Sequence, residues 1–157
     1  RKMECLKQRS LQQKTLIGYL VMQFKISESQ LQILIFDWCH LNRVKYPELE
    51  LLFHIPNGGY RNIATAKRLK AEGVKAGVPD LFLPVARGGY YGLFIEVKTK
   101  GGVLSNTQEW WLKALGEQGY FASVAYSFDE AIGILKNYLE MKNIELKKES
   151  VEDEGTG

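Results

Sequence analysis

The stretch 91–99, which reads YGLFIEVKT, constrains the fold of this chain more than any other segment. Side chains along a strand point alternately to the two faces of a sheet, so Glu96 and Lys98 share one face while Ile95 and Val97 share the other. A carboxylate inside an apolar strand is costly unless a partner compensates its charge. The stretch therefore predicts a strand with one face in a core and one face that carries charged chemistry.

A second carboxylate, Asp80, opens the preceding apolar run, 80–84. An Arg-Gly-Gly tripeptide at 87–89 lies between the two runs and favours a turn. If the runs pair as a hairpin, Asp80 can approach Glu96 and Lys98. Two carboxylates suit a hard divalent cation such as Mg²⁺ or Mn²⁺, which prefers oxygen ligands, and the added lysine suits a phosphodiester.

Capping signals and apolar periodicity divide the rest of the chain into helices and strands. Two Ser-x-x-Gln capping boxes, Ser27 to Gln30 and Ser105 to Gln108, predict the starts of two helices. The order of elements predicts an α/β domain with a single mixed central sheet flanked by helices. The predicted helices span about 28–43, 61–72, 105–117 and 128–141, and the predicted strands span about 49–55, 80–84, 91–99 and 120–126.

The two ends of the chain differ from this body. Residues 1–26 predict an N-terminal helical extension, because leucines recur loosely across 3–24. Residues 143–157 are dominated by charge, with an excess of acids, and predict a disordered tail. We therefore expect one domain of ordinary size over 27–142.

Charge and cysteine content narrow the class of protein. The formal net charge is +3, and because the tail is acidic the body is more basic than that value. This distribution fits a protein that binds polyanions, and it equally fits an ordinary solvated surface. Cys5 and Cys39 are too few for a disulfide framework, and Cys39 falls in an apolar helical pattern that predicts a buried, reduced thiol. Neither a run of membrane-spanning length nor a Walker motif occurs, so we expect no membrane association and no nucleotide cofactor.

These motifs resemble a known family. Helix–strand–strand–strand–helix–strand is the shared core of the PD-(D/E)XK nuclease superfamily, and this chain looks like that core with the helix at 61–72 inserted after the first strand. Neighbouring features narrow the resemblance to the virus-type replication-repair nuclease (VRR-NUC) domain of the stand-alone phage and bacterial type, over roughly residues 28–126. The residues that carry it are Pro79-Asp80, Glu96-Val97-Lys98, the IPNGG run at 55–59, the GVPDL run at 77–81, Gly101, and Ser105-x-x-Gln108 with Trp111-Leu112.

The resemblance implies a restriction-endonuclease-like fold and a metal-dependent endonuclease that acts on DNA. Asp80 and Glu96 would supply carboxylate ligands to Mg²⁺ or Mn²⁺, and the Val97 carbonyl would supply another. Glu28, at the start of the first helix, matches a glutamate that completes the metal site in this family. An acid at this position also complements the helix dipole, and both roles remain open.

The resemblance also assigns roles to two polar side chains beside the carboxylates. Lys98 would hold the attacking water and stabilise charge on the phosphate in the transition state. Gln108 matches a glutamine near the metal-bound water or the DNA, and it also fits the third position of the capping box opened by Ser105. The sequence does not separate these two readings of Gln108.

The expected DNA contacts lie in glycine-rich turns and in the most basic stretch of the chain. Glycine turns allow close backbone approach to phosphates, and a basic helix can follow a DNA strand. A solvated helix face is the alternative for the same lysines. The predicted contacts are Asn57, Gly58, Gly59, Arg61, Lys67, Arg68, Lys70, Lys75, Arg87 and Lys100.

Finally, the resemblance implies a homodimer that cuts branched DNA, such as Holliday junctions, in the cytoplasm of a bacterial or phage-infected cell. Two alternatives remain open. One is a restriction-like or nicking nuclease that acts on linear duplex DNA. The other is a non-catalytic nucleic-acid-binding module that retains the fold.

Overall fold

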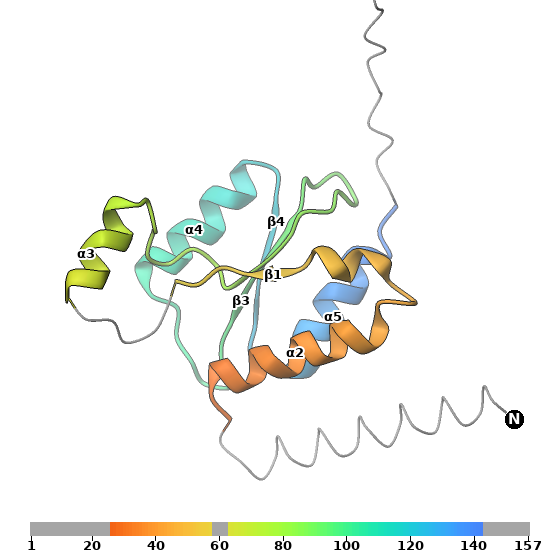
Figure 1. The fold of residues 1–157 in the computed structure, drawn as a ribbon. Helices are drawn as coiled ribbons and strands as arrows, with labels where there is room; N and C mark the ends of the chain where they lie inside the picture. Colours follow the sequence, from red (N-terminus) through yellow and green to blue (C-terminus); the bar gives the residue numbers. More distant parts are fainter. Residues whose placement is uncertain (1–25, 58–62, 143–157) are drawn as a thin grey trace, which may run out of the picture.

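The computed structural model describes residues 26–57 and 63–142 (Figure 1). The predicted helical extension over 3–24 and the predicted tail over 143–157 lie outside them. Among the expected DNA contacts, Gly58, Gly59 and Arg61 also lie outside the described residues.

The predicted order of helices and strands is confirmed, with small shifts at their ends. In chain order the elements are α2 (Glu28–Asn42), η1 (Pro47–Leu51), β1 (Phe53–His54), α3 (Ile63–Ala71), β2 (Leu81–Leu83), β3 (Leu93–Val97), α4 (Asn106–Glu117), β4 (Phe121–Ala125) and α5 (Phe128–Leu139). Both predicted capping boxes are present, at Ser27 for α2 and at Ser105 for α4. In the described parts of the chain, no helix is long and apolar enough to cross a membrane.

The four strands form one mixed sheet in the order β1-β2-β3-β4. The predicted hairpin is confirmed, because β2 pairs antiparallel with β3 and Leu81 lies opposite Ile95. β1 pairs antiparallel with β2, whereas β4 runs parallel to β3. The last pair is joined by α4, as parallel neighbours require a crossover connection.

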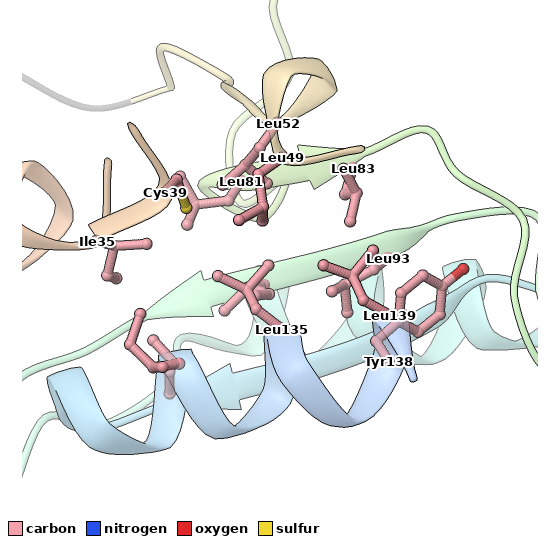
Figure 2. Close-up of a cluster of buried hydrophobic side chains, with 14 of the residues drawn as sticks. Ile35, Cys39, Leu49, Leu52, Leu81, Leu83, Leu93, Leu135, Tyr138 and Leu139 are labelled. Carbon is pink, nitrogen blue, oxygen red and sulfur yellow. The ribbon is translucent and has the colours of Figure 1, made fainter. Parts of the chain in front are cut away.

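One face of the sheet is sealed by α2 and α5, and the hydrophobic core lies there (Figures 1 and 2). Ile35 of α2 and Leu135 of α5 meet the strand residues Leu81 and Leu93, and all four are fully buried. Each such side chain contributes roughly 1.5–3 kcal/mol through its burial. Ile95 and the valine two residues after it on β3 belong to the same cluster, so the predicted alternation along this strand is confirmed.

The prediction of a strand over 49–55 is wrong for its first half. Pro47 begins a single 3₁₀ turn, η1, that places Leu49 in the core, and only Phe53 and His54 pair as a strand. The predicted buried thiol is confirmed, since Cys39 is free and buried, and burial raises its pKa to about 12. Such a thiol is unreactive, because the thiolate is the nucleophilic form.

Candidate active site

The pairing of β2 with β3 brings the two motif carboxylates together. Leu81 lies opposite Ile95, and extending that register by one residue sets Asp80 beside Glu96. The backbone N–H of Val97 donates a hydrogen bond to Asp80 Oδ2 at 2.9 Å, which fixes the carboxylate against β3. Both acids point away from the core and lie on the face of the sheet that carries α4.

Lys98 joins the same cluster from the end of β3. Its Nζ lies 3.0 Å from Glu96 Oε1 and 3.5 Å from Glu28 Oε1, so one ammonium contacts two carboxylates. The lysine is buried, and the turn that follows leaves room for its stem because a Cβ on Gly102 would approach Lys98 Cβ and Cδ at 3.3 Å. Glu28 reaches the cluster because the capped first turn of α2 lies at this end of the sheet.

Gln108 completes the capping box of α4 and also contacts the carboxylate of Glu96. Its Oε1 accepts a hydrogen bond from the Ser105 backbone N–H at 2.9 Å, which completes the capping box of α4. Its Nε2 donates to Glu96 Oε1. The two roles are compatible because the amide carries an acceptor and a donor on different atoms.

Burial sets the electrostatics of the cluster. Glu96 is 1% exposed, and this desolvation, reinforced by the negative charge of Asp80, raises its pKa to about 7. Desolvation also raises the pKa of Asp80, although the Val97 N–H acts in the opposite direction. Burial by itself would lower the pKa of Lys98, but its hydrogen bond to Glu96 and the surrounding carboxylates raise it. The lysine is therefore charged beside two acids that burial makes reluctant to ionise.

This arrangement fits a divalent cation. Within 26–57 and 63–142 no group of three His, Cys, Asp or Glu side chains converges as a finished ligand set. Asp80 and Glu96 nonetheless form a pair of neighbouring carboxylates in a desolvated site, and a cation between them would offset the burial and repulsion that raise their pKa values. Their oxygen donors are those that Mg²⁺ and Mn²⁺ prefer.

The segment that leads to Asp80, residues 76–80, is held by side chains that the sequence does not predict to contact it. Three of them donate hydrogen bonds to its carbonyls: Trp111 Nε1 to Ala76 at 3.0 Å, Asn57 Nδ2 to Val78 at 2.7 Å, and His54 Nδ1 to Asp80 at 2.9 Å. These donors come from α4, β1 and the loop after β1, far apart in sequence from their acceptors. No local pattern could have revealed them.

The structure explains why the GVPD run at 77–80 begins with a glycine, Gly77. Its φ is +83°, a conformation that L side chains rarely adopt, and a Cβ there would lie 2.8 Å from Thr107 Cγ2. The glycine therefore allows this segment to turn and to lie directly on the first turn of α4. Pro79 then enters the interior just before Asp80.

The predicted DNA contacts fall into separate groups. Lys67, Arg68 and Lys70 are exposed on α3, which stands apart from α2 and α5 (Figure 1). Lys75 and Lys100 are exposed as well, in the loop before β2 and in the turn after β3. Asn57 is turned inward by its bond to Val78, so its side chain already has a structural role.

Arg87 is placed away from this group. Its guanidinium pairs with Glu48, and its side chain is only 11% exposed. The hairpin tip that carries it lies at the opposite end of β2 and β3 from Asp80 and Glu96, because Leu83 and Leu93 pair between them. Arg87 is therefore engaged in an ion pair with Glu48 away from the acid cluster, and the DNA contact expected of it stays a prediction.

A mixed four-stranded sheet with flanking helices, which brings a carboxylate pair and a lysine together at one end of a central hairpin, defines the α/β class of restriction-endonuclease-like domains. The model of the VRR-NUC domain family matches residues 25–129. A solved structure described as a "VRR_NUC domain protein" is 30% identical, with a TM-score of 0.66, and the match covers 76% of this chain and 93% of that chain. A comparison with curated proteins finds no match. The chain belongs to the VRR-NUC family, a family of nuclease domains.

Proposed function

We propose that this chain is a metal-dependent endonuclease that hydrolyses phosphodiester bonds in DNA. The observation that carries the proposal is the buried Glu96, held beside Asp80 and 3.0 Å from the Lys98 ammonium. A buried carboxylate beside a second acid is destabilising in a protein that does not use it. Perturbed acids that share a site with a cation are typical of catalytic centres.

Asp80, Glu96, the Val97 carbonyl and Glu28 would hold Mg²⁺ or Mn²⁺. When bound, such an ion polarises the scissile phosphate and makes water a stronger acid. The chain's own contribution is to hold these oxygens in place. The Val97 N–H fixes Asp80, and Gln108 Nε2 fixes Glu96.

Lys98 supplies positive charge where the reacting phosphate gains negative charge. Its ammonium is a compact point charge on a stem held by the turn after β3, and it donates toward two carboxylates. Once these carboxylates face a cation, the same ammonium can hold the attacking water or a phosphate oxygen. Gln108 positions Glu96 and is available to the same water through its amide.

For the substrate, we propose branched DNA, including four-way junctions, cut by a homodimer. A two-fold dimer would present two equivalent sites, which suits the symmetry of a junction. The exposed lysines of α3, such as Lys67 and Lys70, would follow the phosphate backbone, because contacts of this kind position DNA without reading its sequence. Membership of a nuclease family supports DNA as the substrate class.

The test is cleavage of end-labelled four-way junction, flap and linear duplex DNA in Mg²⁺ or Mn²⁺, with EDTA as the metal-free control. Lys98→Met removes the ammonium and keeps most of the stem, so we expect cleavage to fall by about 10²-fold or more. Lys113→Met is the matched control, since Lys113 is an exposed lysine of α4. It should cleave like the wild type.

The substrates separate the rival functions. Symmetric cuts in the junction, together with a dimer in sedimentation equilibrium, would support the branched-DNA endonuclease. Equal cutting of linear duplex would favour a restriction-like or nicking nuclease. If calorimetry detected no binding of Mg²⁺ or Mn²⁺ and no substrate were cut, the chain would be a nucleic-acid-binding module rather than an enzyme.

A further inference from the structure

The hydrogen-bonded ladder between β1 and β2 ends beside Asp80. The last paired residues are His54 and Leu81, and one further bond runs from the Ile55 N–H to the Asp80 carbonyl at 2.7 Å. β1 is an edge strand of two residues, so it offers few backbone bonds to its neighbour. The position of Asp80 on this side of the sheet therefore depends on the groups that supplement the ladder.

The chain leaves β1 through a tight turn at Pro56. The Asn57 N–H donates to the Ile55 carbonyl at 2.8 Å, and a bond between residues two apart defines a γ-turn. Proline suits the centre of this turn because its ring fixes φ at about −65°. If the register of β1 and β2 continued, Asn57 would lie opposite Val78 and its N–H would bond the Val78 carbonyl. The turn therefore takes away the backbone donor that would hold Val78.

Two side chains supply the contacts that the backbone does not. Asn57 Nδ2 donates to the Val78 carbonyl at 2.7 Å, which is the acceptor that its own N–H would have in a continued ladder. His54 Nδ1 donates to the Asp80 carbonyl at 2.9 Å, in addition to the bond from Ile55. A carbonyl oxygen has two lone pairs and can accept both bonds. The backbone is thus held at Asp80 and again two residues before it.

The position of the Asp80 backbone determines where its carboxylate lies. The Val97 N–H holds Asp80 Oδ2 at 2.9 Å from β3, so the residue is fixed at its side chain by one neighbouring strand and at its carbonyl by the other. Mg²⁺ requires its oxygen ligands at about 2.0–2.1 Å in near-ideal octahedral geometry. A shift of a few tenths of an ångström at Asp80 would therefore weaken a cation site shared with Glu96.

We propose that Asn57 and His54 are positioning residues of the candidate metal site, which act through the backbone carbonyls of Val78 and Asp80. This inference rests on the proposed nuclease function. It gives Asn57 a task within the protein in place of the DNA contact expected from the sequence. Partners that hold a metal ligand in place support the affinity for the metal although they do not touch it.

The surroundings of the two donors favour this role over a contribution to the core. His54 is exposed and Asn57 is half-buried, and neither belongs to the hydrophobic cluster between the sheet and α2 and α5. Their replacement leaves that core intact. The effect of losing either bond should therefore be concentrated at Asp80.

The first test is calorimetric titration of the protein with Mn²⁺ alone, without DNA. Asn57→Leu has nearly the shape of asparagine and cannot donate, so it should weaken Mn²⁺ binding by about tenfold, as should His54→Leu. His54→Asn carries its amide nitrogen on Cγ, as histidine carries Nδ1, and should bind Mn²⁺ within about twofold of the wild type. His54→Gln carries its amide one bond farther out and should resemble His54→Leu.

His40→Leu is the matched control for the histidine variants. His40 is exposed in the last turn of α2 and contacts Arg43 Nη1 at 2.8 Å. Glu28, which belongs to the acid cluster, lies in the first turn of the same helix, and twelve residues of helix span about 18 Å. His40→Leu should therefore bind Mn²⁺ like the wild type.

The second test needs neither metal nor catalysis. The Val97 amide donates to Asp80 Oδ2, whereas the next amide, that of Lys98, donates to the Ala125 carbonyl of β4 at 2.8 Å. Hydrogen exchange measured by NMR in EDTA should be faster at Val97 by about fivefold or more in the two leucine variants, and should be unchanged at Lys98. His54→Asn should restore slow exchange at Val97.

The outcomes separate this proposal from the proposed function. Unchanged Mn²⁺ affinity and unchanged Val97 exchange in the leucine variants would overturn the positioning role and leave the metal-dependent nuclease intact. Equal acceleration at Val97 and Lys98 would also overturn it, because the two side chains would then support only general stability. If the wild type bound no Mn²⁺, the metal-dependent nuclease would be refuted, and selective exchange at Val97 would still show that the two side chains hold Asp80.

Discussion

The carboxylate of Glu96 is held by two donors and opposed by one acid. Lys98 and Gln108 donate to its Oε1, whereas Asp80 lies beside it with the same charge. One lysine does not neutralise the buried Glu96, the partly buried Asp80 and Glu28 as well. The folded protein therefore contains a local excess of negative charge, which a divalent cation would satisfy and which destabilises the metal-free form at neutral and alkaline pH.

This imbalance predicts how the stability of the metal-free protein depends on pH. The pKa of Glu96 rises from 4.5 in its ordinary state to about 7 in the folded protein, so between these values the folded state binds the extra proton. The stability that this group contributes should therefore be fully present below about pH 4.5. The free energy of unfolding should fall as the pH rises through about 7. A shift of this size corresponds to at most about 3 kcal/mol.

Urea unfolding in EDTA at a series of pH values would measure this loss. Glu96→Gln cannot ionise, so it should flatten the decline and make the metal-free protein more stable than the wild type at pH 8. Adding Mn²⁺ should stabilise the wild type and not the variant. A wild type whose stability is constant from pH 5 to pH 8 would contradict the assigned environment of Glu96.

For single residues, the sequence predicts the placement of side chains that follow strand alternation. It does not predict contacts between residues that are far apart in the sequence. The shared face of Glu96 and Lys98 follows from the period of two along β3, and the structure shows them in contact. The pairing of Arg87 with Glu48 joins residues 39 apart, and the bond from His54 to the Asp80 carbonyl joins residues 26 apart. Neither leaves a local signal.

Among the elements, α4 links its own stability to the geometry of the site. Ser105 caps the helix and contacts Gln108, whose other end holds Glu96. Ser105→Ala should cost about 1 kcal/mol of stability through the lost cap. It should also lower the cleavage rate by about two- to tenfold, because Gln108 loses one of its anchoring hydrogen bonds.

Ser127 provides the comparison, since it caps α5 through the Glu130 N–H and does not contact the acid cluster. Ser127→Ala should show a similar loss of stability in thermal unfolding and an unchanged single-turnover rate. Equal effects of the two substitutions on the rate would mean that Gln108 does not depend on its cap.

The segment between α3 and β2 offers a second comparison, between two glycines. Gly73 and Gly77 both have positive φ, but a Cβ on Gly73 meets open space whereas one on Gly77 meets Thr107. Gly73→Ala should cost about 1 kcal/mol from backbone strain alone. Gly77→Ala should cost at least about 1 kcal/mol more, because α4 would be displaced.

Chemical denaturation of both alanine variants measures this difference. The Gly77 variant should also lose activity, since the same segment carries Asp80 to the site. Identical midpoints for the two variants would contradict the close packing of this segment on Thr107.

The short length of β1 shows why the strand predicted over 49–55 is only partly present. The run 49–55 is rich in apolar residues, and that composition predicts a strand. Pro47 instead starts a 3₁₀ turn, and Leu49 enters the core from that turn, so only Phe53 and His54 remain to pair with β2. Short apolar runs do not distinguish a turn from a strand, because burial and not periodicity decides between them.

For the molecule as a whole, DNA binding should depend on salt through the lysines of α3. Each phosphate contact contributes about 0.9 to the slope of log affinity against log salt concentration. Replacing Lys67 and Lys70 by glutamine should therefore reduce the magnitude of that slope by about 2. Filter binding or anisotropy across a salt series would measure it.

A paired control uses two exposed lysines elsewhere, Lys113 on α4 and Lys142 after α5. Their replacement by glutamine makes the same change in net charge, so the slope should stay at the wild-type value. If both double variants reduced the slope equally, the binding would follow total charge and α3 would have no special part in it.

The alternation along β3 also determines what would happen to a molecule whose strands paired out of register. The same period of two assigns Ile95 and Val97 to the core and Glu96 and Lys98 to the opposite face. A slip of one residue in strand pairing would drive an ammonium and a carboxylate among the leucines of the core, and would move the isoleucine and the valine to the face that carries the acids. A misaligned molecule would therefore be open to proteolysis instead of persisting as a compact, inactive form, so the intact protein in a cell would also be the correctly assembled one.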